Sequence, residues 1–135
     1  MVDDEPDIAY LFRDALGTIE GIDVFAFTDS TLALEHFQIN YGNYSCVITD
    51  YRMPSMNGVE LLDKVQEINP DTKRILISAL QDDLFKDCHS IDQFLSKPII
   101  IKELIKVVQQ YVRIVRYNQD LIKAVLDSDD VYHKV

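Results

Sequence analysis

Hydrophobic residues follow two alternating patterns along this chain. Short runs rich in apolar and β-branched residues predict strands. Between these runs, apolar residues recur every three or four positions, which predicts helices. The predicted strands are 21–29, 46–50, 73–78 and 94–95, and the predicted helices cover 6–16, 30–39, 59–68 and the stretch from 101 onward. Strands that alternate with helices favour parallel pairing through right-handed crossovers, so we expect a layered α/β domain.

Capping residues mark the expected ends of the helices. Pro6 suits the first turn of a helix, and Asp4 is the expected cap of that helix. Asp29 or Ser30 is the expected cap of the second helix. Residues 81–91 are polar and only weakly periodic, which predicts a short or irregular fourth helix.

Composition narrows the class of protein. The chain has 135 residues, the length of one domain, and a net charge of −10. A surface that neutralises phosphates needs clustered Lys and Arg, so direct binding of nucleic acid is disfavoured. No apolar run is long enough to span a membrane, and no signal peptide is visible. Cys46 and Cys88 lack the spacing of metal ligands. We therefore expect a soluble cytoplasmic protein.

Charged and polar residues follow the predicted strands. Asp3 and Asp4, Asp50, Ser78 and Lys97 each stand at or just after the end of a strand. The carboxyl ends of parallel strands share one edge of the sheet, so these side chains can converge there. Each pair of carboxylates about 4 Å apart repels by roughly 4 kcal/mol at an effective dielectric of ~20. A hard, oxygen-preferring cation such as Mg²⁺ relieves that repulsion.

These groups together suggest one chemistry. Mg²⁺, the Lys97 ammonium and the Ser78 hydroxyl around a carboxylate are the parts needed to move a phosphoryl group onto that carboxylate. Asp50 is then the nucleophile, and the product is an aspartyl phosphate.

Four motifs carry a resemblance to a known family. They are VDDEPD at 2–7, TDYRMPSMNG at 49–58, ISA at 77–79 and FLSKP at 94–98. Over about residues 2–115 the chain resembles a response-regulator receiver domain of two-component signalling, like the chemotaxis receivers. The resemblance implies a flavodoxin-like, doubly wound parallel sheet of five strands in three layers. It also implies a phosphoprotein that catalyses only its own phosphorylation and dephosphorylation and is otherwise not an enzyme.

The resemblance assigns the site residues. Asp50 accepts the phosphoryl group from a sensor histidine kinase or a phosphotransfer protein. Asp4 ligates Mg²⁺ directly, Asp3 does so mainly through water, and the backbone carbonyl of Arg52 is the third protein ligand. Lys97 binds the phosphoryl oxygens, and its peptide bond to the following proline is often cis in the family.

A conformational switch is also implied. Ser78 moves toward the phosphoryl group, and Phe94 turns inward as Ser78 moves, so that a surface for a downstream protein effector changes. The alternative for Phe94 is an ordinary core aromatic.

The N-terminus departs from the family pattern. Only Met1 and Val2 precede Asp3, so the first and central strand is largely missing. Our preferred explanation is that the numbering starts at an internal methionine or that upstream residues are omitted. The alternatives are a rearranged sheet or a strand donated by a partner chain. The spacing of 19 residues from Ser78 to Lys97 is also shorter than usual, which predicts a short fourth helix.

The C-terminal stretch has two interpretations. In the first, the receiver domain is 1–116, its last helix packs on the sheet, and 117–135 is a helical extension or tail. In the second, a heptad repeat pairs two chains as a homodimer, with Asn118 fixing the register. The heptad positions are Leu104, Val107, Tyr111, Ile114, Asn118, Leu121 and Val125.

Two other functions are alternatives to the phosphoaccepting receiver. A phosphorylation-independent adaptor with a receiver fold is favoured by the missing strand but disfavoured by the complete acidic pocket. A phosphohydrolase with an aspartyl nucleophile needs a second acid where Arg52 stands. Arg52 and Leu80 are both poor at orienting an attacking water, which predicts slow autodephosphorylation.

Overall fold

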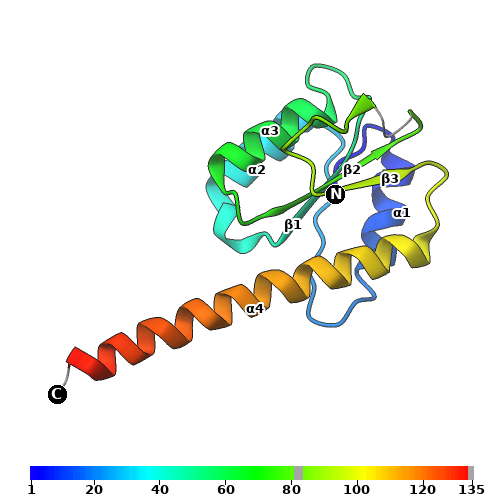
Figure 1. The fold of residues 1–135 in the computed structure, drawn as a ribbon. Coiled ribbons are helices and arrows are strands. Elements are labelled where there is room, and N and C mark those ends of the chain that lie inside the picture. The colour runs from blue at the N-terminus through cyan, green and yellow to red at the C-terminus, as the bar shows by residue number, and fades with distance from the viewer. Residues whose placement is uncertain (81–83, 134–135) are drawn as a thin grey trace.

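A parallel sheet with helices on both faces forms the molecule (Figure 1). The computed structural model describes residues 1–80 and 84–133, with side chains as far as residue 126. Among these residues the sheet has three strands in the order β1-β2-β3. The strands are β1 (Cys46–Asp50), β2 (Lys73–Ser78) and β3 (Gln93–Ser96), and the helices are α1 (Pro6–Leu16), α2 (Ser30–Asn40), α3 (Gly58–Ile68) and α4 (Ile101–His133), with a 3₁₀ turn η1 at Tyr41–Asn43.

Alternating side chains of the strands build a core on each face of the sheet. Val47 and Leu76 pack with residues of α2 and α3 on one face. Ile48, Ile75 and Ile77 pack with α1 and α4 on the other face. Strands buried on both faces need apolar residues at successive positions, which is the pattern that the sequence showed. The predicted three-layer α/β fold is confirmed.

The N-terminal residues lie between β1 and the segment that leads into α2. Val2 forms single parallel bridges to Phe27 on one side and to Thr49 on the other. Burial lowers the pKa of the Met1 amine to about 5. The first residues of the chain thus hold the central position expected for the first strand. In place of a full strand, they form only the two bridges of Val2.

The prediction of a strand over 21–29 is wrong, because within that range only Phe27 is paired. A strand forms only where a neighbouring segment pairs with it over several residues, and here the pairing is the single bridge between Val2 and Phe27. The five strands that the resemblance implied are therefore three strands and two isolated bridges in the part of the chain that the structure describes.

A side chain caps the N-terminus of α2, whereas no side chain caps that of α1. Asp29 caps α2, since its side chain accepts hydrogen bonds from the N–H groups of Thr31 and Leu32. The expectation that Asp4 caps α1 is wrong, because the N-cap is Glu5 and its side chain makes no capping bond. The Glu5 N–H instead donates to Oδ1 of Asp3 at 2.9 Å, which draws that carboxylate to the start of the helix.

The segment before β3 contains turns. The structure describes no α-helix over 84–91, and residues 81–83 of the predicted fourth helix lie outside the described residues. The turns are held by Arg74, which is buried at the start of β2. Its guanidinium donates to the carbonyls of Ser90, Pro70 and Thr72 and lies 3.3 Å from the Asp92 carboxylate.

Helix α4 is the longest element, with 33 residues, and it crosses position 116 without a break. Its first half packs on the sheet through Leu104, Val108, Val112 and Val115. The second half extends away from the other elements (Figure 1). Apolar side chains at Leu121 and Val125 are exposed there, and Ile114 is exposed in the first half. None of the described helices is both long enough and apolar enough to cross a membrane.

Candidate functional site

Asp50 is the last residue of β1, at the carboxyl edge of the sheet. Its side chain is nearly buried, with 6% of the residue exposed. The Asp50 N–H donates to the carbonyl of Val2 at 2.9 Å, and the Thr49 hydroxyl donates to the Asp50 carbonyl at the same distance. The backbone on both sides of the carboxylate is therefore fixed.

Gly58 lets the loop after β1 fold back onto the strand end. A Cβ at this position would lie 2.3 Å from the Asp50 carbonyl oxygen and 2.8 Å from Cδ1 of Leu76. The Gly58 N–H donates to the carbonyl of Tyr51 at 2.8 Å. At the other side of the loop, the buried Ser30 hydroxyl donates to the Met56 carbonyl at 2.9 Å. The loop is thereby tied to β1 and to the start of α2.

Three carboxylates meet beside this loop. One oxygen each of Asp3, Asp4 and Asp50 lies within 4.8 Å of the others. Asp3 and Asp50 are buried, whereas Asp4 is exposed. Burial raises the pKa of Asp3, and the charges of Asp50 and Asp4 raise it further, against the opposing effects of the Glu5 N–H and Lys97. The charges of the neighbouring carboxylates therefore disfavour ionisation of Asp3.

The donor set fits a hard divalent cation. Oxygens from two buried carboxylates and one exposed carboxylate leave room for water or phosphate, which is the way proteins bind Mg²⁺. Asp4 also lines an open groove next to the cluster, with a volume of about 570 Å³. Arg52, Asn57 and Leu80 line the same groove. The predicted ligands Asp3, Asp4 and Asp50 thus lie together, with Arg52 beside them.

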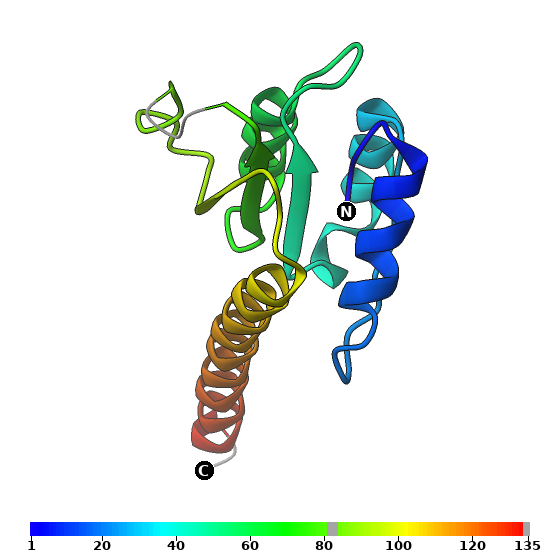
Figure 2. The ribbon, with the colours of Figure 1, turned by 90° about the vertical axis from the view of Figure 1, so that its right-hand side faces the viewer.

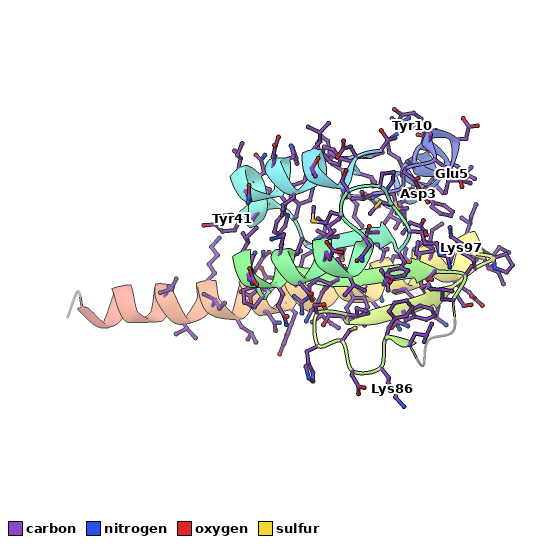
Figure 3. The ribbon with its side chains drawn as sticks, turned by 90° about the horizontal axis from the view of Figure 1, so that it is seen from above. Asp3, Glu5, Tyr10, Tyr41, Lys86 and Lys97 are labelled. Atoms are coloured by element: carbon purple, nitrogen blue, oxygen red, sulfur yellow. The ribbon has the colours of Figure 1, made fainter. Side chains whose placement is uncertain are left out.

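Lys97 reaches the cluster from the end of β3. Its Nζ lies 2.9 Å from Oδ1 of Asp50. Desolvation lowers the pKa of Lys97, but the hydrogen bond to Asp50 and the charges of Asp50, Asp3 and Glu5 outweigh it, so the net pKa is raised. The Lys97–Pro98 peptide bond is cis, the form that the resemblance implied. Figure 3 shows Asp3 and Lys97 at the same end of the molecule, opposite Tyr41.

Ser78 ends β2, the strand between those of Asp50 and Lys97. It is buried, and its hydroxyl accepts a hydrogen bond from the Leu80 N–H at 3.0 Å. Its carbonyl accepts from the Lys97 N–H at 2.9 Å. The hydroxyl therefore stands at the same sheet edge, held by the turn that follows β2.

Sequence reasoning missed an aromatic cluster beside the site. Phe94 is half-buried and stacks on Phe85, with ring centroids 5.5 Å apart. Phe85 in turn meets the edge of Tyr51, the residue after Asp50, at 4.9 Å. A signal existed, because Phe85 is the one aromatic residue in the polar stretch 81–91. The predicted switch aromatic is thus linked by ring contacts to the loop that follows the acidic strand end.

Comparison with known proteins agrees with this geometry. The family described as "Response regulator receiver domain" matches residues 1–109. The response regulator receiver protein CpdR of Brucella abortus (strain 2308) is 30% identical over 115 residues, which cover 82% of this chain and 92% of CpdR. The chain spans only 15%, 28% and 9% of the length of three other curated relatives that it matches.

Solved structures match as well. The receiver domain of the Francisella response regulator 1452 has a TM-score of 0.70 and 34% identity, and the match covers 83% of this chain and 93% of that one. The response regulator TrrA of Thermotoga maritima, solved in complex with Mg²⁺-BeF, has a TM-score of 0.69 and 30% identity, covering 82% of this chain and 94% of that one. The fold, the acidic cluster and these matches have one explanation: the chain belongs to the response regulator receiver domain family.

Proposed function

We propose that Asp50 accepts a phosphoryl group from the phosphohistidine of a sensor kinase or a phosphotransfer protein in the cytoplasm. The observation that carries this proposal is the placement of the Lys97 ammonium 2.9 Å from the Asp50 carboxylate, beside the oxygens of Asp3 and Asp4. A carboxylate that served only as a structural ion pair would not need two further carboxylates next to it.

In the transfer, a bond forms between an Asp50 carboxylate oxygen and phosphorus. The bond between phosphorus and the donor's imidazole nitrogen breaks, and the imidazole leaves with the bonding electron pair. Asp3, Asp4, Asp50 and the Arg52 carbonyl would hold Mg²⁺, and a bound Mg²⁺ would neutralise charge on the phosphoryl oxygens. Lys97 supplies the second cation, since its ammonium already lies at the acceptor.

The readout of phosphorylation is a rearrangement around Ser78. Its hydroxyl oxygen accepts a hydrogen bond from the Leu80 N–H, and a phosphoryl group on Asp50 would offer a charged acceptor for the hydrogen of that hydroxyl. Movement of Ser78 and Leu80 would change the space next to Tyr51, Phe85 and Phe94, whose rings are in contact. The output is then a protein surface that a downstream effector recognises.

Homodimerisation through α4 is a further part of the proposal, with 1–116 as the receiver domain and 117–135 as its helical extension. The exposed apolar residues Ile114, Leu121 and Val125 support it, because they stand at heptad positions of the helix. An interface between two copies of this helix would bury them.

The test of the phosphoacceptor is an intact-mass measurement after incubation with a small-molecule phosphodonor and Mg²⁺. We expect a single phosphoryl adduct that requires Mg²⁺ and is absent from the Asp50→Asn variant. The alternative function is a phosphorylation-independent adaptor with a receiver fold. A folded protein that forms no adduct would overturn the phosphoacceptor and favour the adaptor.

A further inference from the structure

The loop 51–57, which joins β1 to α3, contains a strained turn. Ser55 has a φ of 69°, a backbone conformation that residues other than glycine rarely adopt. The Met56 N–H donates to the Pro54 carbonyl at 2.8 Å, so the bond closes a turn of three residues around Ser55. A turn of this kind with a positive φ at its centre is the rare and strained form of the γ-turn. Figure 2 shows the loop extending past the end of β1 before it returns to α3.

A buried hydroxyl holds the residue that ends this turn. Ser30 is the first residue of α2, and its Oγ donates to the Met56 carbonyl at 2.9 Å in a buried hydrogen bond. The Met56 side chain is also buried, in the core between the sheet and the helices α2 and α3. Both backbone groups of Met56 are therefore engaged, the N–H within the turn and the carbonyl by a helix 26 residues earlier in the chain.

The Ser30 hydroxyl is available because another residue caps α2. The Asp29 side chain accepts the hydrogen bonds from the N–H groups of Thr31 and Leu32, so the Ser30 side chain is left to bond outside the helix. The same cap fixes the first turn of α2, which carries Ser30. Without the hydroxyl, the Met56 carbonyl would lose this buried partner, and the strained turn next to it would rearrange toward water.

The same loop forms one wall of the candidate site. It starts at the residue after Asp50, and its residues line the open groove beside the acidic cluster together with Asp4. The Arg52 carbonyl is the third protein ligand for Mg²⁺ in the proposed function. A carboxylate side chain can rotate toward an ion, whereas a backbone carbonyl moves only with its loop. The conformation of the loop therefore decides whether this ligand is in place before the ion binds.

We propose that Ser30 is a positioning residue for the Mg²⁺ site. Its hydrogen bond to Met56 holds the loop in the conformation that keeps the Arg52 backbone beside Asp4, so that the ion does not have to order the loop when it binds. The inference rests on the proposed phosphoacceptor function. It adds to that function a residue of α2 that lies outside the acidic cluster.

The experiment compares the full chain with its Ser30→Ala variant. Isothermal titration calorimetry measures the dissociation constant of Mg²⁺, and intact mass measures the rate of adduct formation with a small phosphodonor over a series of Mg²⁺ concentrations. In Ser30→Ala we expect the dissociation constant and the Mg²⁺ concentration for half-maximal rate to rise about tenfold, as for a loop that is in place in roughly one molecule in ten. The rate at saturating Mg²⁺ should stay within about twofold, because the bound ion selects the ordered loop.

Thr72→Val is the matched control for lost stability. The Thr72 hydroxyl is also buried and also donates to a carbonyl, that of Tyr44, at 3.0 Å. It precedes β2, at the opposite end of that strand from Ser78. Both variants should unfold at lower urea concentrations, but only Ser30→Ala should bind Mg²⁺ more weakly. An equal loss of Mg²⁺ affinity in Thr72→Val would assign the effect to general destabilisation and overturn the role of Ser30.

A measurement on the unmodified chain covers the case in which Ser30→Ala does not fold. Amide hydrogen exchange, followed by NMR, reports on the Met56 N–H of the γ-turn. We expect this N–H to be protected in the presence of a chelator, and Mg²⁺ to change its exchange rate by less than about threefold. If Mg²⁺ slows this exchange by about tenfold or more, the ion itself orders the loop and the proposal is overturned.

The measurements separate failure of this inference from failure of the proposed function. If Ser30→Ala forms the adduct with the same Mg²⁺ dependence as the unmodified chain, the role of Ser30 is rejected and the phosphoacceptor stands. If the folded, unmodified chain binds no Mg²⁺ and forms no adduct, both are rejected.

Discussion

The side chains of Lys97 and Asp50 form an ion pair across the end of β2, a strand that contains neither residue. Asp50 closes β1 and Lys97 follows β3, yet Nζ lies 2.9 Å from Oδ1, and β2 runs between the two strands. The Lys97 N–H also donates to the carbonyl of Ser78, the last residue of β2. The charge pair and the predicted switch hydroxyl are thus connected through a single residue, Lys97.

Removal of this ammonium should slow phosphorylation. In a Lys97→Gln variant, we expect the rate of adduct formation with a small phosphodonor to fall by about 10²-fold, because one cation that neutralises the phosphoryl oxygens is lost. The time course of the intact mass measures this rate. Lys102→Gln, an exposed lysine in the first turn of α4, is the control and should match the unmodified chain. Equal rates for both variants would contradict the role of Lys97.

A methyl group at Gly58 should destabilise the fold. The Cβ of Gly58→Ala would lie 2.3 Å from the Asp50 carbonyl oxygen, which forces the loop away from β1 at a cost of about 1–3 kcal/mol in the free energy of unfolding. Urea denaturation measures the change. Gly42→Ala is the matched control, since no atom lies within 4 Å of its added Cβ, and it should stay within about 0.5 kcal/mol.

Mg²⁺ should stabilise the chain against heat. The ion relieves repulsion among Asp3, Asp4 and Asp50, and at 100 times its dissociation constant it adds about 2.7 kcal/mol. A thermal melt with Mg²⁺ and with a chelator measures the effect. Asp4→Asn is expected to remove most of it, and because Asp4 is exposed, the variant should still fold. An equal shift of the melting temperature in this variant would argue against a site at Asp4.

The Cys46 thiol should resist alkylation near neutral pH. Burial raises the pKa of Cys46 to about 12, with a smaller contribution from the charge of Asp92. A raised thiol pKa favours the protonated form, so at pH 8 only about one molecule in 10⁴ carries the reactive thiolate. We expect iodoacetamide labelling, followed by mass spectrometry, to rise about tenfold per pH unit between pH 8 and 11. Labelling at pH 8 as fast as that of free cysteine would contradict this.

The exposed face of α4 should hold two copies together. We expect the full chain to sediment as a dimer and a Leu121→Glu variant to sediment as a monomer, because the substitution puts a charge at a core position of the heptad. Lys123→Glu on the same helix is the control, since position 123 lies outside the heptad core, and it should remain dimeric. If the unmodified chain sediments as a monomer, the proposal of a homodimer is rejected.

The site was more predictable from the sequence than the sheet was. Asp3, Asp4, Asp50 and Lys97 could be placed together because each follows a strand, and parallel strands end at one edge. Those residues do lie together. Whether residues 21–29 form a strand could not be predicted from that stretch alone, since a strand also needs a hydrogen-bonded partner from another part of the chain. In the structure, Phe27 of this stretch forms one bridge, and its partner is Val2.

The contacts of buried polar side chains also could not be predicted from short stretches of sequence. Arg74 stands at the start of β2, where an arginine is usually exposed, but it is buried among carbonyls of Ser90, Pro70 and Thr72. That arrangement depends on the path of the turns before β3, and no short-range pattern specifies it. The stack of Phe94 on Phe85 has the same origin.

The uninterrupted α4 has a mechanical consequence. About 18 residues of this helix follow Val115, the last buried residue among the side chains that the structure describes, and at ~1.5 Å per residue they reach roughly 27 Å. A tilt of about 10° where the helix meets the sheet would therefore displace its far end by roughly 5 Å. Small shifts in the packing of Leu104 and Val108 would therefore become larger displacements at the far end of the helix.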